Sequence, residues 1–353
     1  MSNIAPQDMM KNALICDLAF GFEPEIEFHG NKWDVLDEYR TAGLSYISLH
    51  VAVDTTSLET TVKYIATVSQ KITHSDKYLL VETVEDILKA KQLKKLGVCL
   101  VFQGANPIAK SLDMLDLYYK IGVRSMILYY NTRNFIGDGC AETRDAGLSL
   151  FGKKVIARMN QVGLLIDCSH TGYKTAMEII EHSRQPVIFS HSNAYAVKNH
   201  ARNIKDDLIQ AIAASGGLVG ISGVGVLLGG EDHIVQRIAD HMEHIIQLVG
   251  VEHVALGSDR IYFPNTIANV LQANPVLYPQ EYDVMKVSNP PKWTSFQPTQ
   301  IPDLIEALFK RHLTESDIKK ILGENYLRVA RQVWRTAPTH HEASDLQTAG
   351  IGG

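Results

Sequence analysis

Short apolar runs alternate with segments of helical periodicity along almost the whole chain, and this alternation limits the possible folds more than any other feature. The apolar runs are continuous, which is typical of parallel strands that are buried on both faces. Eight of them are expected to be strands, at residues 14–16, 45–53, 98–102, 125–129, 164–168, 186–189, 218–221 and 253–256. Helices are expected at residues 33–41, 58–68, 84–95, 112–121, 150–162, 174–183, 206–214, 234–249, 302–310 and 316–334.

Eight evenly spaced units of this kind predict a closed (β/α)8 (TIM) barrel. A doubly wound open sheet is the alternative, but no G-x-G-x-x-G motif follows the first strand. The 353 residues, 45% of them hydrophobic, are sufficient for one large barrel. We expect a single domain over residues 1–336, a disordered tail over residues 337–353, and a long loop over the carboxyl-terminal face at residues 261–300.

The composition argues against several classes of partner. A net charge of −5 disfavours nucleic acid, because phosphate binding needs a basic surface. The first residues lack the pattern of a signal peptide, and no apolar stretch approaches the ~18 residues of a membrane span. The four cysteines form no C-x-x-C pair, which indicates free thiols in a reducing compartment. These features predict a cytoplasmic protein without a membrane partner.

The carboxyl-terminal ends of barrel strands carry the chemistry in this fold, so the residues there are the candidates. His170 ends the fifth expected strand and His191 the sixth, each after a serine, and Asp259 follows the eighth. Two imidazoles on adjacent strands can face one point, and neutral imidazole is a good ligand for Zn²⁺, Fe or Mn. A nearby carboxylate can ligate the metal or accept a proton. The alternative is that both histidines are buried and hydrogen-bonded without a ligand. His50 is the one other histidine that can face the interior, depending on its parity along the second strand.

Five collinear stretches resemble the membrane (renal) dipeptidase family. They are GLSLFG (147–152), Met159-Asn160, GLLIDCSHTG (163–172), PVIFSHSNA (186–194) and ARNIKDD (201–207). The resemblance, with weaker matches on either side, covers about residues 14–333 and is that of a divergent, bacterial-type member. It implies a barrel of the metal-dependent-hydrolase type that binds two zinc ions and cleaves dipeptides. By the same resemblance, His170 and His191 bind one zinc, Arg202 holds the substrate carboxylate, and Asp259 transfers protons.

The chain departs from the family pattern at the other zinc. The family's first strand carries His-x-Asp, whereas the preferred register here places Leu18 and Phe20 at those positions. The register one residue further along places Ala19 and Gly21 there. The bridging glutamate matches Gln103, so the ligand set is incomplete.

A substrate-contacting histidine of the family matches Tyr130, which is followed by Asn131. We therefore expect one zinc per chain, with Tyr130, Asn131, Gln103 and Arg202 contacting the substrate.

These observations predict a membrane-dipeptidase-like hydrolase that cleaves a dipeptide or a small carboxylate-bearing amide. The expected partners are this small-molecule substrate and a second copy of the chain in a homodimer. Two alternatives stay open. One is a non-hydrolytic lyase or isomerase reaction in the same pocket, and the other is a non-catalytic ligand-binding homologue.

Overall fold

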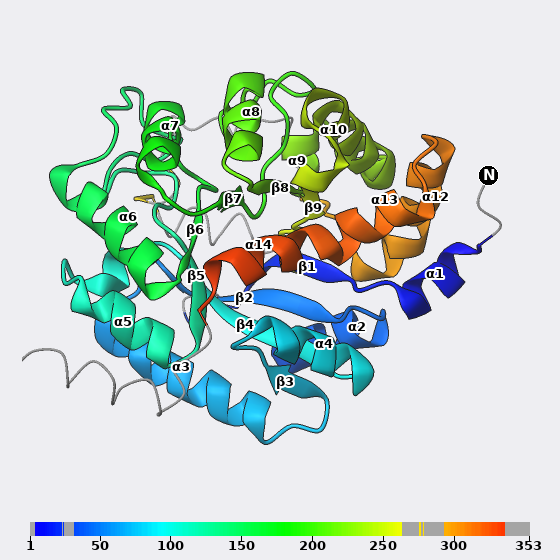
Figure 1. Cartoon of the computed structure of the whole chain (residues 1–353), viewed down its shortest axis with the longest axis horizontal. Helices are drawn as coiled ribbons and strands as arrows, with labels where there is room; N and C mark the ends of the chain where they lie inside the picture. Colours follow the sequence, from blue (N-terminus) through cyan, green and yellow to red (C-terminus); the bar gives the residue numbers. More distant parts are fainter. Residues whose placement is uncertain are drawn as a thin grey trace, which may run out of the picture.

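A ring of eight parallel strands forms the centre of the computed structural model, which describes residues 4–22, 24, 32–262, 275–276, 278 and 293–335 (Figure 1). The strands are β1 (Cys16–Gly21), β2 (Tyr46–Val53), β4 (Leu96–Gln103), β5 (Val123–Ile127), β6 (Leu165–Asp167), β7 (Val187–Phe189), β8 (Leu218–Ile221) and β9 (Val254–Leu256). Each pairs in parallel with the next one in this order.

The ring closes between its first and last strands through hydrogen bonds just beyond β9. The backbone N–H of Ser258 donates to Oδ1 of Asp17 at 2.7 Å, and that of Asp259 donates to the carbonyl of Ala19 at 3.2 Å. The predicted (β/α)8 barrel is therefore confirmed, and the doubly wound open sheet is excluded.

Helices surround the ring and bury their apolar faces against it (Figure 1). They are α2 (Lys32–Thr41), α3 (Leu58–Thr73), α5 (Asp113–Lys120), α6 (Leu150–Val162), α7 (Tyr173–His182), α8 (Asp206–Ala214), α10 (Ile234–Val249) and α12 (Ile301–Lys310). Local sequence sets their ends, as α6 illustrates. Ser149 caps its first turn by accepting the N–H of Gly152 at 2.9 Å, and Gly163 ends it in a left-handed conformation with φ of 92°.

Inward-facing residues of most of the strands fill the ring with an apolar cluster that includes Cys16, Leu18, Val101, Leu165 and Ile188. The helix α14 (Asn325–Val333) extends this cluster and covers the amino-terminal end of the ring, together with α4 (Val84–Gln92). The hydroxyl groups of Tyr46 and Tyr326 are hydrogen-bonded there at 2.7 Å. Because this end is packed, chemistry is left to the carboxyl-terminal end.

Several elements differ from the sequence-based expectation. The helices α1 (Pro6–Asn12) and α9 (Gly225–Leu228) and the strand β3 (Tyr78–Leu80), which pairs with the start of β4, are too short to show a periodic pattern. The single helix expected at residues 316–334 is divided into three segments. They are α13 (Glu315–Lys319), a π-helical turn at Lys320–Glu324, and α14. The first strand, expected at residues 14–16, instead covers Cys16–Gly21 and so includes Asp17, whose buried carboxylate has backbone N–H partners.

The expected tail lies outside the described residues, and so does most of the 261–300 loop. Of the part that is described, Ser295 pairs with Val224 in an isolated bridge, and Phe296 is buried. None of the described helices has the length and apolar character needed to cross a bilayer. The four cysteines are free, and three of them are buried as predicted.

Candidate functional site

The imidazoles of His170 and His191 meet in the mouth of the barrel. His170 follows the end of β6 and His191 follows the end of β7. Their Nε2 atoms are 2.9 Å apart, and their ring centroids are 5.0 Å apart. The structure thus brings together the two histidines that the paired Ser-His motifs singled out.

Each imidazole is oriented through its other nitrogen. Nδ1 of His170 lies 2.7 Å from Oδ1 of Asn131, and Nδ1 of His191 lies 2.8 Å from the hydroxyl of Ser190. Since Oδ1 of Asn131 only accepts, Nδ1 of His170 donates, and the lone pair of the neutral ring is left on Nε2. Burial, with the positive charge of Arg202, holds the pKa of both histidines well below its usual value. Both rings are therefore in the neutral form that binds metal ions.

A buried carboxylate fixes the two strand ends that carry the histidines. Oδ1 of Asp167, the last residue of β6, accepts the N–H groups of Ser169 at 2.9 Å and Ser190 at 3.0 Å. The N–H of His191 donates in turn to the hydroxyl of Ser169 at 3.1 Å. Burial raises the pKa of Asp167, although its hydrogen bonds to Ser190 and Ser169 act in the opposite direction. The serines of the two motifs thus join β6 to β7.

Tyr130 and Asn131 form one wall of the site. The ring of Tyr130 stacks on His170, with centroids 4.3 Å apart and planes 22° apart. Its N–H donates to Oδ2 of Asp54 at 3.1 Å, and its hydroxyl is hydrogen-bonded to that of Tyr278. Asn131 has a left-handed backbone, with φ of 63°. Both residues, expected as substrate contacts, therefore also orient His170.

The segment after β9, which carries Asp259, packs tightly against the end of β7. A Cβ on Gly257 would lie 1.8 Å from the carbonyl oxygen of Ser190 and 3.3 Å from Cβ of His191, so only glycine fits there. Burial raises the pKa of Asp259 to about 6, and the positive charge of Arg202 lowers it. At neutral pH this carboxylate can accept a proton and release it again.

Arg202 is buried beside the histidines and has only neutral partners. Its Nη2 donates to the carbonyl of His191 at 3.2 Å, and its Nη1 lies 3.4 Å from the hydroxyl of Ser192. Its charge affects the pKa values of His170, His191 and Asp259, so all four groups share one region. Among the described residues no carboxylate pairs with Arg202, and a buried guanidinium of this kind favours an anionic ligand.

His50 and Gln103 lie on the strands that face this pair. The ring centroid of His50, within β2, is 5.8 Å from that of His191, which shows that His50 faces the interior. Its buried Nδ1 has no hydrogen-bond partner among the described residues, and burial lowers its pKa to about 3. Gln103 ends β4 with a buried side chain.

No three histidine, cysteine, aspartate or glutamate side chains in the described part of the chain are arranged to hold a metal ion. The metal ligands that the geometry offers are therefore the two paired imidazoles.

The first strand differs from the preferred register. A bulge between Asp17 and Phe20 shifts the pairing, so that Phe20 pairs with Leu49 and Gly21 with His50. The ring of Phe20 packs 4.8 Å from that of Tyr39 and so belongs to the layer outside the ring of strands. Gly21, rather than Phe20, lies beside the inward-facing His50, so the preferred register was wrong at this position.

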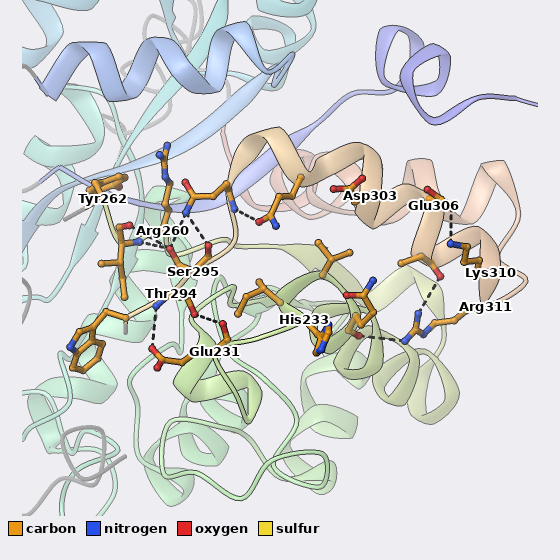
Figure 2. A pocket seen from close by; sticks show the side chains of 18 residues that line it. Glu231, His233, Arg260, Tyr262, Thr294, Ser295, Asp303, Glu306, Lys310 and Arg311 are labelled. Atoms are coloured by element: carbon orange, nitrogen blue, oxygen red, sulfur yellow. Dashed lines mark hydrogen bonds and ion pairs between the residues drawn. The ribbon is translucent and has the colours of Figure 1, made fainter. Parts of the chain in front are cut away.

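Two cavities lie near the mouth. One, of about 300 Å³, borders His170 and Arg202 and has apolar walls that include Phe189 and Leu208. A larger one, of about 850 Å³, lies between α10, α12 and residues 293–300, and neither paired imidazole lines it. Figure 2 shows Arg260 and Ser295 at one end of this larger cavity and Lys310 and Arg311 at the other. Of these two cavities, which described residues line, the smaller one reaches the candidate site.

Sequence reasoning missed three buried aspartates, Asp17, Asp54 and Asp167, whose carboxylates hold the backbone around the site. Burial raises the pKa of Asp17 to about 7 and that of Asp54 to about 6, partly offset by their hydrogen bonds. The available signal was an acidic residue directly after an apolar strand run, as in Val53-Asp54 and Ile166-Asp167.

Comparisons with known proteins identify relatives of this chain. A family model for membrane dipeptidase (peptidase family M19) matches residues 30–276. The dipeptidase aclJ of Aspergillus oryzae (strain ATCC 42149 / RIB 40) is 32% identical over 248 residues, which are 69% of this chain and 53% of that protein. The dipeptidase verJ of Clonostachys rogersoniana is 28% identical over 262 residues, 74% of this chain and 61% of that protein. The chain thus spans little more than half the length of these curated relatives.

Solved structures share the whole fold. An amidohydrolase from Pseudomonas aeruginosa has a TM-score of 0.83 and 30% identity, over 94% of this chain and 99% of that one. A metallopeptidase from Rhodobacter sphaeroides, liganded with a phosphinate mimic of the dipeptide L-Ala-D-Ala, has a TM-score of 0.70 and 18% identity, over 91% and 100%. Because the family model covers well over half of the sequence, the chain belongs to the membrane dipeptidase family.

Proposed function

We propose that the chain is a zinc-dependent hydrolase that cleaves the amide bond of a dipeptide, or of a small amide that bears a carboxylate. The observation that carries the proposal is the pair of neutral imidazoles, His170 and His191, with Nε2 atoms 2.9 Å apart beside the buried Arg202. The dipeptidases among its relatives support a dipeptide substrate, as does the dipeptide mimic bound to the Rhodobacter sphaeroides metallopeptidase.

The separation of the two imidazole nitrogens matches that of two ligands on one zinc ion. Two nitrogens at about 2.0–2.1 Å from a zinc ion, with an angle of about 90–109° between them, lie roughly 2.9–3.4 Å apart. His170 and His191 would hold the ion, with Gln103 or Asp259 and water completing its shell. When bound, zinc polarises the substrate carbonyl and lowers the pKa of a water molecule.

The protein residues supply binding and proton transfer. Arg202 binds the substrate carboxylate through its planar guanidinium. Asp259, whose raised pKa lies close to neutral, accepts a proton from the attacking water and delivers it to the leaving nitrogen. The amide of Gln103 orients the scissile carbonyl, while Tyr130 and Asn131 hold His170 in place.

The test uses the full chain purified with zinc, with L-Ala-D-Ala, L-Ala-L-Ala and the carboxamide of L-Ala-D-Ala as substrates. We expect about one zinc per chain, hydrolysis of the free dipeptides, and a kcat/KM at least tenfold lower for the carboxamide. His191→Ala should lose both zinc and turnover, whereas His74→Ala, on the exposed end of α3, should keep both.

Two other results would overturn the proposal in different ways. Bound zinc without hydrolysis of either dipeptide would favour a non-hydrolytic reaction in the same pocket. A chain that binds no zinc, and whose ligand binding survives His170→Ala, would be a non-catalytic member of the family.

A further inference from the structure

Three buried aspartates, Asp17, Asp54 and Asp167, share an unusual pattern of backbone contacts, and we call them the clamp aspartates. Oδ1 of Asp17 accepts the N–H of Ala19 at 3.2 Å and that of Ser258, beyond β9, at 2.7 Å. Oδ1 of Asp167 accepts the N–H groups of Ser169 and Ser190 in the same way. Each carboxylate therefore joins its own strand to the end of a neighbouring one.

Asp54 follows β2 and makes the corresponding contacts with both of its oxygens. Oδ1 accepts the N–H of Asn106, and Oδ2 accepts that of Tyr130, each at 3.1 Å. The side chain of Asn134 also donates to Oδ2 at 3.2 Å. Asp54 thus holds the segments that follow β4 and β5.

In all three places, the residue after a clamped N–H has a left-handed backbone and carries a side chain of the site. His170 follows the clamped Ser169 and has φ of 66°. Asn131 follows the clamped Tyr130, with φ of 63°. Asp259 follows the clamped Ser258, with φ of 48°.

A positive φ is strained for a residue with a side chain and persists only when the surroundings fix it. We propose that the three clamp aspartates are positioning residues, each of which holds one left-handed turn that points a working side chain into the barrel mouth. Asp167 positions His170, Asp54 positions Asn131 together with the ring of Tyr130, and Asp17 positions Asp259. The roles of these side chains rest on the proposed function, whereas the geometry of the clamps does not.

Short strands explain why carboxylates are needed at two of the three places, those of Asp17 and Asp167. β6, β7 and β9 each have three residues, so the ladder of the sheet ends before it reaches the site. Backbone N–H groups that are buried beyond a ladder need another acceptor, and a carboxylate makes stronger hydrogen bonds to them than a neutral group does.

The test compares Asp17→Ala, Asp54→Ala and Asp167→Ala, which remove the accepting oxygens, in the full chain with a matched control, Asp86→Ala. Asp86 also accepts two backbone N–H groups and a hydroxyl, at the start of α4, but no residue of the site follows its partners. The readouts are the zinc dissociation constant from chelator competition, and kcat and KM for L-Ala-D-Ala.

Asp54→Ala and Asp167→Ala should weaken zinc binding about 10- to 100-fold, because they release groups that orient a ligand. Asp17→Ala should lower kcat at least tenfold, since it displaces Asp259, and should weaken zinc binding less than the other two variants because both imidazoles stay in place. Asp86→Ala should lower the urea midpoint and change neither zinc binding nor kcat. If the three clamp variants behaved like Asp86→Ala, their role would be structural only and the proposal would be overturned.

Crystal structures of the variants test the clamps independently of the proposed function. Each variant should lose the positive φ at its own site residue and keep it at the other two, even if the wild-type chain hydrolyses no peptide. Asn131→Gly provides a second route if Asp54→Ala folds poorly, because glycine adopts a left-handed conformation without strain. In that background, Asp54→Ala should lower the urea midpoint less than it does in the wild-type chain. An equal loss in both backgrounds, or an unchanged φ, would contradict the proposal.

Discussion

Oδ1 of Asn131 accepts a hydrogen bond from Nδ1 of His170 at 2.7 Å and thereby directs the other nitrogen of the ring toward His191. Partners of this kind fix both the tautomer and the orientation of a metal-binding histidine. Asn131→Ala should therefore weaken zinc binding about 10- to 100-fold. Competition with a chromogenic chelator measures the change.

The control for this prediction is Asn160→Ala, which removes a partly buried amide on α6 that bonds to Ser183 and Arg184. This variant should bind zinc like the wild-type chain. An Asn131→Ala protein with unchanged zinc affinity would show that stacking on Tyr130 alone is enough to orient His170.

The barrel and the paired histidines were predictable because each leaves a local mark in the sequence. Eight continuous apolar runs indicate eight strands, and a Ser-His pair at the end of two neighbouring runs places His170 and His191 at one rim. The choice of Arg202 as a site residue rested on the family resemblance alone, and the structure shows that this residue is buried beside the histidines.

The first strand was not predictable in the same way. A single-residue slip turns every side chain of a strand to the other face, and the bulge between Asp17 and Phe20 introduces such a slip. For the same reason, an aspartate after an apolar run does not show that its carboxylate will meet the backbone of the neighbouring strand. The clamp aspartates became visible only when the register of β1 against β9 and of β6 against β7 was known.

Replacement of Arg202 should separate carboxylate binding from catalysis. Arg202→Met should lower kcat/KM for L-Ala-D-Ala by at least thirtyfold, which corresponds to the roughly 2–5 kcal/mol lost with one partner of a buried charge pair. The carboxamide substrate should be much less affected, so the preference for the free carboxylate should nearly vanish. A variant that still preferred the free dipeptide would place the carboxylate elsewhere.

The same variant also predicts a shift in the pH profile. The charge of Arg202 lowers the pKa of Asp259, which lies near 6, so its removal should raise that pKa. The acidic limb of kcat/KM for the carboxamide should therefore move to higher pH in Arg202→Met. Arg202→Lys keeps the charge and should keep the limb in place, although lysine lacks the planar fork of arginine and should therefore still impair binding of the free dipeptide.

His50 should make the metal-free protein sensitive to acid. Burial lowers the pKa of His50 from 6.5 to about 3. Above about pH 6.5 this residue is neutral in both the folded and the unfolded chain, so it does not lower the free energy of unfolding there. As the pH falls below this value, the unfolded chain gains a proton that the folded chain does not. The loss from this one residue is about 1.4 kcal/mol per pH unit, until the pH approaches 3.

Urea unfolding at pH 7, 6 and 5 in the presence of a chelator tests this prediction. His50→Gln should show a pH dependence that is shallower than that of the wild-type chain by about 1.4 kcal/mol per unit. The comparison with wild type is essential, because Asp17, with its pKa raised to about 7, contributes in the opposite direction. His74→Gln, at an exposed position, should match wild type, and an unchanged slope in His50→Gln would refute the prediction.

The register of β1 can be tested by restoring the ligands that the family resemblance leads one to expect. The observed pairing places Gly21 beside the inward-facing His50, so Ala19→His with Gly21→Asp and Gln103→Glu should create a second metal position. The alternative set, Leu18→His with Phe20→Asp and Gln103→Glu, buries a carboxylate where Phe20 now packs against Tyr39. Loss of that ring alone should cost about 3–5 kcal/mol, and the unpaired charge adds to this loss.

Zinc content and urea unfolding distinguish the two sets. The first should be folded with about two zinc ions per chain, and the second should be largely unfolded. A folded second set with a second zinc ion would show that Phe20, and not Gly21, occupies the ligand position.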